Sequence, residues 1–107
     1  MNAERFNEIV NKQIEDIKDI LLTKSIEYAT DDRLYNFKKG NELFGSKDLP
    51  SSVCWGYMLK HLVSVHDIAN GIRAASLEQI NEKIGDSINY LILLKGLLIE
   101  QLEQKNG

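Results

Sequence analysis

The sequence has a single cysteine, and it lacks the motifs of several enzyme classes. With Cys54 alone, the chain forms no internal disulfide and no zinc site built on several cysteines. It contains neither a phosphate-cradling glycine loop of the Walker or Rossmann type nor a serine in a nucleophile-elbow pattern. The helical pattern around Cys54 predicts that its thiol faces the core, which disfavours a thiol enzyme.

Long apolar runs are absent as well. The longest, YLILL at residues 90–94, is followed by Lys95 and is too short to span a bilayer. The first residues, MNAERFNEIV, lack the apolar stretch of a signal peptide. We therefore expect a cytoplasmic protein that binds no membrane.

Positive charge is scarce and scattered. The formal net charge is −3, and no long stripe of lysine and arginine runs along the chain. Binding to a long nucleic acid needs many cationic contacts, so the sequence disfavours that partner. A small anion needs only a few cations and amides, and that class of ligand stays open.

Helical periodicity, in contrast, is abundant. It predicts an all-α fold: an antiparallel helical bundle of three long helices plus a short helix or loop, in a single domain over residues 1–107. The first helix is predicted over residues 3–28, where apolar residues recur at alternating four- and three-residue steps. Residues 29–50 are rich in turn formers, so we expect a long connection with a short helical turn, a common setting for binding loops.

The other two long helices have recognisable ends. The second is predicted over residues 50–71, with proline in its first turn, Asp48 or Ser51 as its cap, and a glycine at its end. The third is predicted over residues 76–104. Its first residues, S-L-E-Q at 76–79, fit a capping box, in which the serine and the glutamine satisfy each other's free amides.

The last helix is apolar nearly all round. Ile88, Ile92 and Ile99 extend its main apolar face, while Leu93 and Leu97 point elsewhere. Such a helix needs cover on several sides, which two other long helices of a small chain hardly supply. The sequence therefore predicts a homo-oligomer. The main apolar face consists of Leu77, Ile80, Ile84, Leu91, Leu94, Leu98 and Leu102.

A polar stripe interrupts this helix at Glu82, Asp86 and Asn89, which are spaced by four and three residues. Acidic groups beside an apolar wall need a partner, because an unpaired buried charge is costly. One candidate partner is Mg²⁺, which prefers carboxylate oxygens. The alternative is a solvated margin or an ion pair with Lys60, Lys83 or Arg73.

Two further groups of residues suit a phosphate-bearing ligand. Lys60 can neutralise a phosphate and His61 can donate a hydrogen bond to it; the alternative is a core histidine beside a surface lysine. The stretch KSIEYATDDRLYNF at residues 24–37 combines cations, rings and an amide, which suits a base and its phosphates. Ordinary loop packing explains that stretch equally well.

Four short pieces of the sequence resemble a known group. They are K-S-I-E-Y at 24–28, N-F at 36–37, L-K-H at 59–61 and E-K-I-G-D-S-I-N-Y at 82–90. In this order they resemble small phage and prophage proteins of the all-helical MazG-like nucleoside-triphosphate pyrophosphohydrolase group, including the nucleotide-modification-associated domains. The resemblance implies an oligomer of helical bundles with a nucleotide pocket between helices.

The resemblance also implies a metal site, from which this chain departs. Hydrolases of the group commonly hold Mg²⁺ with a Glu-x-x-Glu and a later Glu-x-x-Asp. Asp86 matches the last acid, but Lys83 stands three residues before it, and Glu82 stands four before. Glu27 has no acidic neighbour at the matching spacing. Because metal-assisted hydrolysis needs several converging carboxylates, the degenerate motif, Glu27, Glu82 and Asp86, favours binding over cleavage.

Three functions follow as hypotheses. The favoured one is a nucleotide-binding helical oligomer, a phage-type protein that sequesters a nucleotide or a nucleotide-derived signalling molecule. The alternatives are a Mg²⁺-dependent nucleoside-triphosphate pyrophosphohydrolase and a helical protein-binding module that uses the surplus apolar face of the last helix. In the favoured hypothesis, phosphate contacts come from Lys24, Lys60, His61 and Arg73, and base or ribose contacts come from Tyr28, Asn36 and Phe37.

Overall fold

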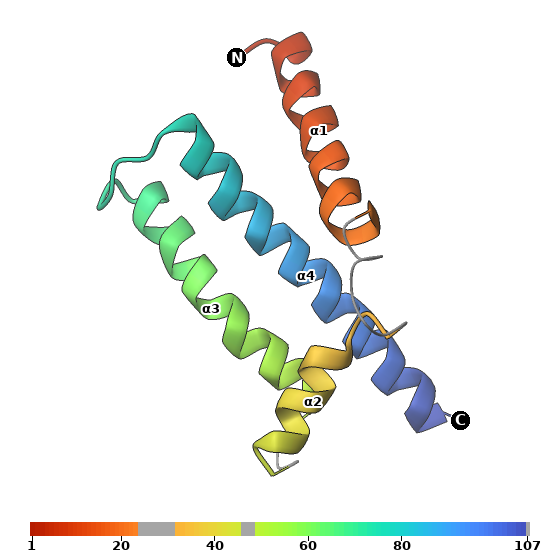
Figure 1. Cartoon of the computed structure of the whole chain (residues 1–107). Coiled ribbons are helices and arrows are strands. Elements are labelled where there is room, and N and C mark those ends of the chain that lie inside the picture. The colour runs from red at the N-terminus through yellow and green to blue at the C-terminus, as the bar shows by residue number, and fades with distance from the viewer. Residues whose placement is uncertain (24–31, 46–48, 107) are drawn as a thin grey trace. The chain divides into compact units, whose positions relative to one another are not determined.

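The computed structural model describes residues 1–23, 32–45 and 49–106, and the regular elements in these ranges are all helices. They are α1 (Ala3–Lys18), a π-helical turn η1 (Asp19–Thr23), α2 (Tyr35–Leu43), α3 (Pro50–Ala69) and α4 (Leu77–Asn106), shown in Figure 1. The all-α prediction is therefore confirmed. Within the same ranges, no helix has the length and hydropathy needed to cross a membrane.

The chain divides into two compact units, residues 1–31 and residues 32–107. The first unit contains α1, which begins at Ala3 as predicted because the side chain of Asn2 caps it, accepting the N–H of Arg5 at 2.8 Å. The helix continues into η1, and no residue of either element is buried. Residues 24–28 of the predicted first helix lie outside the described residues.

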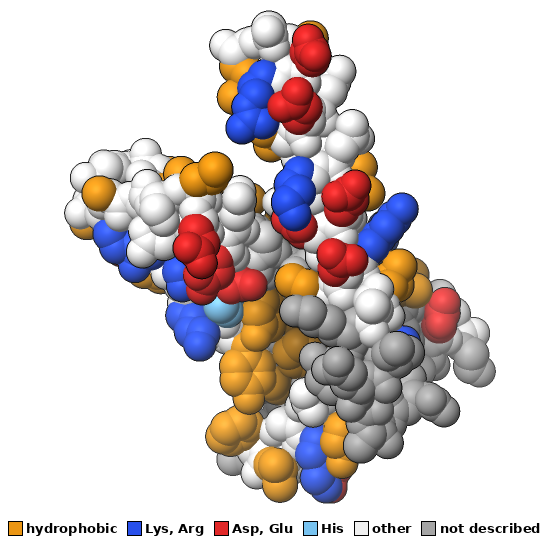
Figure 2. All heavy atoms as spheres, turned by 45° about the horizontal axis from the view of Figure 1, so that its top comes forward, with side chains coloured by type: hydrophobic (Ala, Val, Ile, Leu, Met, Phe, Trp, Pro, Cys, Tyr) orange, Lys and Arg blue, Asp and Glu red, His pale blue; other side chains and the backbone are white. Residues whose placement is uncertain are grey.

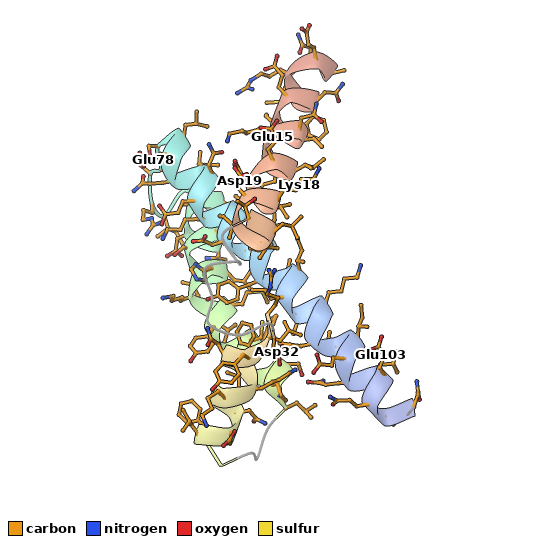
Figure 3. All side chains as sticks on the ribbon, turned by 45° about the vertical axis from the view of Figure 1, so that its right-hand side comes forward. Glu15, Lys18, Asp19, Asp32, Glu78 and Glu103 are labelled. Carbon is orange, nitrogen blue, oxygen red and sulfur yellow. The ribbon has the colours of Figure 1, made fainter. Side chains whose placement is uncertain are left out.

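In the second unit, α2 is the short helix expected within the connection. Asp32 lies shortly before its first turn (Figure 3). The side chain of Asp32 accepts the N–H of Leu34 at 3.0 Å. One side of α2 is anchored by Phe37, which is buried.

The start of α3 differs in one respect from the prediction. Pro50 is its first residue, where the missing N–H costs nothing, but the cap position is Leu49 and no side chain caps it. The prediction of Ser51 as the cap is wrong, because Ser51 already lies in the first turn and its N–H is bonded by the side chain of Gln101 at 3.2 Å. Asp48 lies outside the described residues. At the other end, Gly71 has a φ of 69°, which supports the predicted glycine stop.

The capping box of α4 is confirmed. The N–H of Ser76 donates to Oε1 of Gln79 at 2.9 Å, and the N–H of Gln79 donates to Oγ of Ser76 at 3.1 Å. After this start, α4 continues to Asn106 and runs beside α3 in the opposite direction, while α2 packs against the first turns of α3 (Figure 1).

The core of this unit lies where α2, α3 and α4 meet. Phe37, Cys54 and Leu97 form its centre, and Met58 is also fully buried. The expected orientation of Cys54 is confirmed, and burial raises the pKa of its thiol. On α4, Leu93 and Leu97 were predicted to point away from the main apolar face. These two residues pack in the core, together with Leu94. The other six residues of that face are exposed: Leu77, Ile80, Ile84, Leu91, Leu98 and Leu102.

Candidate functional site

His61 on α3 faces Asp86 and Tyr90 on α4. Its side chain is only 14% exposed, and its ring stacks on that of Tyr90 with centroids 5.0 Å apart and an interplanar angle of 29°. Nδ1 of His61 lies 3.6 Å from Oδ2 of Asp86, which is beyond hydrogen-bond distance but close enough for charge attraction when the ring is protonated. Two predicted site residues, His61 and Asp86, are thus brought together.

A row of aromatic rings continues from this contact. Tyr90 meets Phe37 edge-on at 6.5 Å between centroids, and Phe37 meets Tyr57 at 6.2 Å. These separations and tilts are those that aromatic pairs prefer. Phe37 is covered by its two neighbours and belongs to the core, so its part in ligand binding stays a prediction.

An open groove of about 360 Å³ lies between α2 and α3, next to this row. Two of its rings, Phe44 and Tyr57, are well exposed, at 77% and 49%. At Gly56 an added Cβ would meet no atom within 4 Å, so the wall of the groove is open there. Figure 2 shows a continuous hydrophobic area on one face of this unit, with charged side chains at its edge. The groove is lined by Asn41, Phe44, Ser52, Val53, Gly56 and Tyr57.

Lys60 lies on the same face of α3 as this lining. It follows Gly56 by four residues and Tyr57 by three, and residues at these spacings are neighbours on a helix surface. Its side chain is exposed. The predicted phosphate-binding lysine therefore stands one turn beyond the groove, although the sequence analysis did not identify the groove itself.

The remaining predicted ligand contacts are dispersed. Asn36 is exposed on the first turn of α2. Arg73 is exposed in the connection between α3 and α4, at the end of α3 opposite to α2 (Figure 1), so the structure does not bring it to the groove. Lys24 and Tyr28 lie outside the described residues.

The predicted metal ligands do not form a cluster within the described part of the chain. Glu82 is exposed and contacts its neighbour Lys83, with Nζ and Oε1 3.5 Å apart. This contact matches the ion-pair alternative for Glu82. Among the described residues, no three histidine, cysteine, aspartate or glutamate side chains are grouped to hold a metal ion. Glu27 lies outside those residues, so the complete predicted set is not described.

Sequence reasoning gave no role to an ion-pair cluster around Lys38. Nζ of Lys38 lies 2.7 Å from Oδ2 of Asp32 and 2.5 Å from Oε1 of Glu100. The hydrogen bond with Asp32, followed by the one with Glu100, raises the pKa of Lys38. The same bond from Lys38, followed by the N–H of Leu34, lowers the pKa of Asp32. The cluster ties the start of α2 to α4, and its six- and sixty-two-residue separations leave no periodic signal in the sequence.

Asn89 is a second feature that the sequence did not reveal. Its position in the polar stripe of α4 was recognised, but not its burial. Only 6% of the residue is exposed, and its Oδ1 has no hydrogen-bond partner among the described residues. An unsatisfied buried acceptor is uncommon in folded proteins, so this amide is a costly element of α4.

The pieces that resemble the MazG-like group fall on separate helices: 36–37 on α2, 59–61 on α3 and 82–90 on α4. The piece at 24–28 lies outside the described residues. The contact between His61 and Asp86 joins the second of these helices to the third. Comparison of the chain with protein-family models, with curated proteins and with solved structures gives no match.

Proposed function

We propose that this protein binds a nucleotide, or a signalling molecule derived from one, in the groove between α2 and α3 and holds it intact. The observation that supports this function is the groove itself, with two exposed rings in its wall and Lys60 one turn beyond it. Its volume of about 360 Å³ falls within the range of small-molecule pockets.

Each part of such a ligand has a chemical counterpart in the groove. Phe44 and Tyr57 offer ring faces on which a base can stack. The amide of Asn41 both donates and accepts hydrogen bonds, so it can read a base edge or a ribose hydroxyl. Lys60 supplies a positive charge for a phosphate at the open end. His61 and Asp86 face each other from α3 and α4 next to that lysine.

Binding without cleavage is favoured by the arrangement of the acids. Metal-assisted attack on a phosphorus needs several carboxylates that converge on the metal. Glu82 is turned toward Lys83, and Asp86 toward His61. The proposal is therefore sequestration by a cytoplasmic, phage-type protein, in which the three long helices complete an antiparallel bundle and copies of the chain self-associate.

A thermal-shift screen tests the proposal directly. The probes are linear and cyclic nucleotides and inorganic pyrophosphate, each with and without Mg²⁺, and chromatography then shows whether the added nucleotide is recovered intact. A binder at a hundredfold excess of ligand over Kd is stabilised by about 2.7 kcal/mol. No shift with any probe overturns the proposal. Turnover that is abolished by Asp86→Asn would instead support the pyrophosphohydrolase.

Matched variants locate the site. Tyr57→Ala and Lys60→Ala are expected to reduce the nucleotide-induced shift, the first by removing a stacking surface and the second by removing the phosphate contact. Lys105→Ala removes an exposed positive charge far along α4 and should leave the shift unchanged. A shift that survives both groove substitutions would place the ligand elsewhere.

A further inference from the structure

α4 carries a second apolar face, roughly opposite to the one that fills the core. Its residues recur at alternating steps of four and three, the period of a coiled-coil seam. We call this face the outer seam. Apart from Ile88, its apolar members are between 39% and 67% exposed, although they are leucines and isoleucines. The outer seam consists of Leu77, Asn81, Ile84, Ile88, Leu91, Lys95, Leu98 and Leu102.

The length of the outer seam indicates what covers it. Between residues 77 and 102 it extends for about 38 Å at the rise of an α-helix. α1 and the turn η1 that continues it have 21 residues from Ala3 to Thr23, or about 32 Å, and α2 is shorter still, while α3 already packs on the other side of α4. Only a helix as long as α4 matches the full seam. Among the helices that the structure describes, α4 itself is the one of that length, so a second copy is the fitting occupant.

The two polar residues of the seam, Asn81 and Lys95, select the relative orientation of the two α4 helices. In a parallel pair, Lys95 would face Lys95 of the second copy inside the seam, and like charges repel there. In an antiparallel pair with Leu77 opposite Leu102, all eight positions find a partner. Lys95 then faces Ile84 of the second copy and lies one turn from its Asn81, whose amide oxygen can accept a hydrogen bond from the ammonium. The two lysines are about 16 Å apart along the axis.

We infer that two copies of this protein associate through the outer seam of α4 in antiparallel orientation, with Leu77 of each copy opposite Leu102 of the other. The two-fold axis passes between the levels of Ile88 and Leu91, so the same patch serves on both copies. This inference rests on the self-association included in the proposed function, but it does not depend on the ligand.

Cysteine cross-linking tests the orientation in the full chain. Leu77→Cys and Leu102→Cys are made separately, and the wild-type chain, whose only thiol is fully buried, is the control. A disulfide needs Cα atoms closer than about 7 Å. Antiparallel pairing places two copies of residue 77 about 38 Å apart, so neither variant alone should form a linked dimer under mild oxidation, whereas their mixture should.

Two results would overturn the inference. Linked dimers from each variant alone would show parallel pairing. An absence of linked dimers in all samples, including the mixture, would show that another segment or protein occupies the seam.

Light scattering tests the surface itself. Leu91→Glu is expected to convert a dimer into a monomer with unchanged helix content, because Leu91 lies beside the axis and is half exposed in the isolated chain. Leu43→Glu, at a more exposed leucine of α2, should remain dimeric. A Leu91→Glu protein that remains dimeric would overturn the inference that the copies associate through the outer seam. The thermal shift with nucleotides is measured on the wild-type chain and on the cross-linking variants as well. If no nucleotide shifts the melting temperature while the mixture still forms linked dimers, the proposed ligand is contradicted and the seam is left in place.

Discussion

The helices of the two units have similar amphipathic patterns, but their side chains are buried only in the second unit. In residues 32–107, α3 and α4 share a core with fully buried side chains at Cys54 and Met58. In residues 1–31, α1 has an equally regular apolar seam, and none of its residues is buried. Periodicity therefore predicts that a segment is helical, but it does not predict which surface covers its apolar side. The partner is decided by residues distant in sequence or by another chain.

Truncation of a core leucine should give the largest difference in unfolding free energy between the two units. Leu97→Ala removes a side chain that is 1% exposed, and a cavity of this kind costs about 2–5 kcal/mol of the free energy of unfolding. Ile14→Ala on α1 removes a similar volume from a residue that is 45% exposed, so we expect a much smaller loss. Urea unfolding followed by circular dichroism measures both. Equal losses would show that α1 is buried in the cooperative unit.

Cap removal should give an intermediate effect. Ser76→Ala breaks the reciprocal hydrogen bonds at the start of α4 and should cost about 1 kcal/mol of unfolding free energy. Asn2→Ala removes the corresponding bond of α1. Because no residue of α1 is buried, we expect that change to fray the helix locally, seen as faster amide exchange at its first turn, with the main urea midpoint unchanged. A lowered midpoint in Asn2→Ala would contradict the difference between the units.

The ion-pair cluster around Lys38 should give the smallest effect, with a defined pH dependence. The pKa of Asp32 is below its ordinary value in the folded chain, so its pairing stabilises the fold above about pH 4 and is lost as pH falls through the lowered pKa. Lys38→Met should remove this contribution, which we expect to stay below about 1 kcal/mol because the pair is partly exposed. Thermal melts between pH 2 and 7 measure it. If Lys38→Met lowers the stability by the same amount at pH 2, the effect comes from packing and not from the ion pair.

Local chemistry made the elements of this fold predictable. The proline at residue 50, the capping box at 76–79 and the glycine at 71 each act within a few residues, and the structure has helix boundaries at all three. Ser51 is not the cap because Pro50 holds the first helical position and puts the cap at Leu49. The hydrogen bond from the N–H of Ser51 to Gln101, fifty residues away, depends on how α4 lies against α3, which no local pattern encodes.

The candidate site was predictable only in fragments for the same reason. Lys60, His61 and Asp86 were identified from residue type and spacing, but the contact between the last two was not predicted. The groove was missed because its lining comes from two helices, and no spacing along the chain relates Asn41 or Phe44 to Tyr57. The burial of Phe37, likewise, depends on rings contributed by α3 and α4.

The reactivity of the single cysteine reports how often this fold opens. Cys54 is completely covered, its Sγ lies 3.8 Å from the carbonyl oxygen of Tyr90, and burial raises its pKa, so the closed state offers almost no thiolate to a reagent. A thiol-specific label can react only when α3 and α4 separate. The labelling rate of the unaltered chain therefore reports how often the helices part, and any molecule that holds them together will slow it.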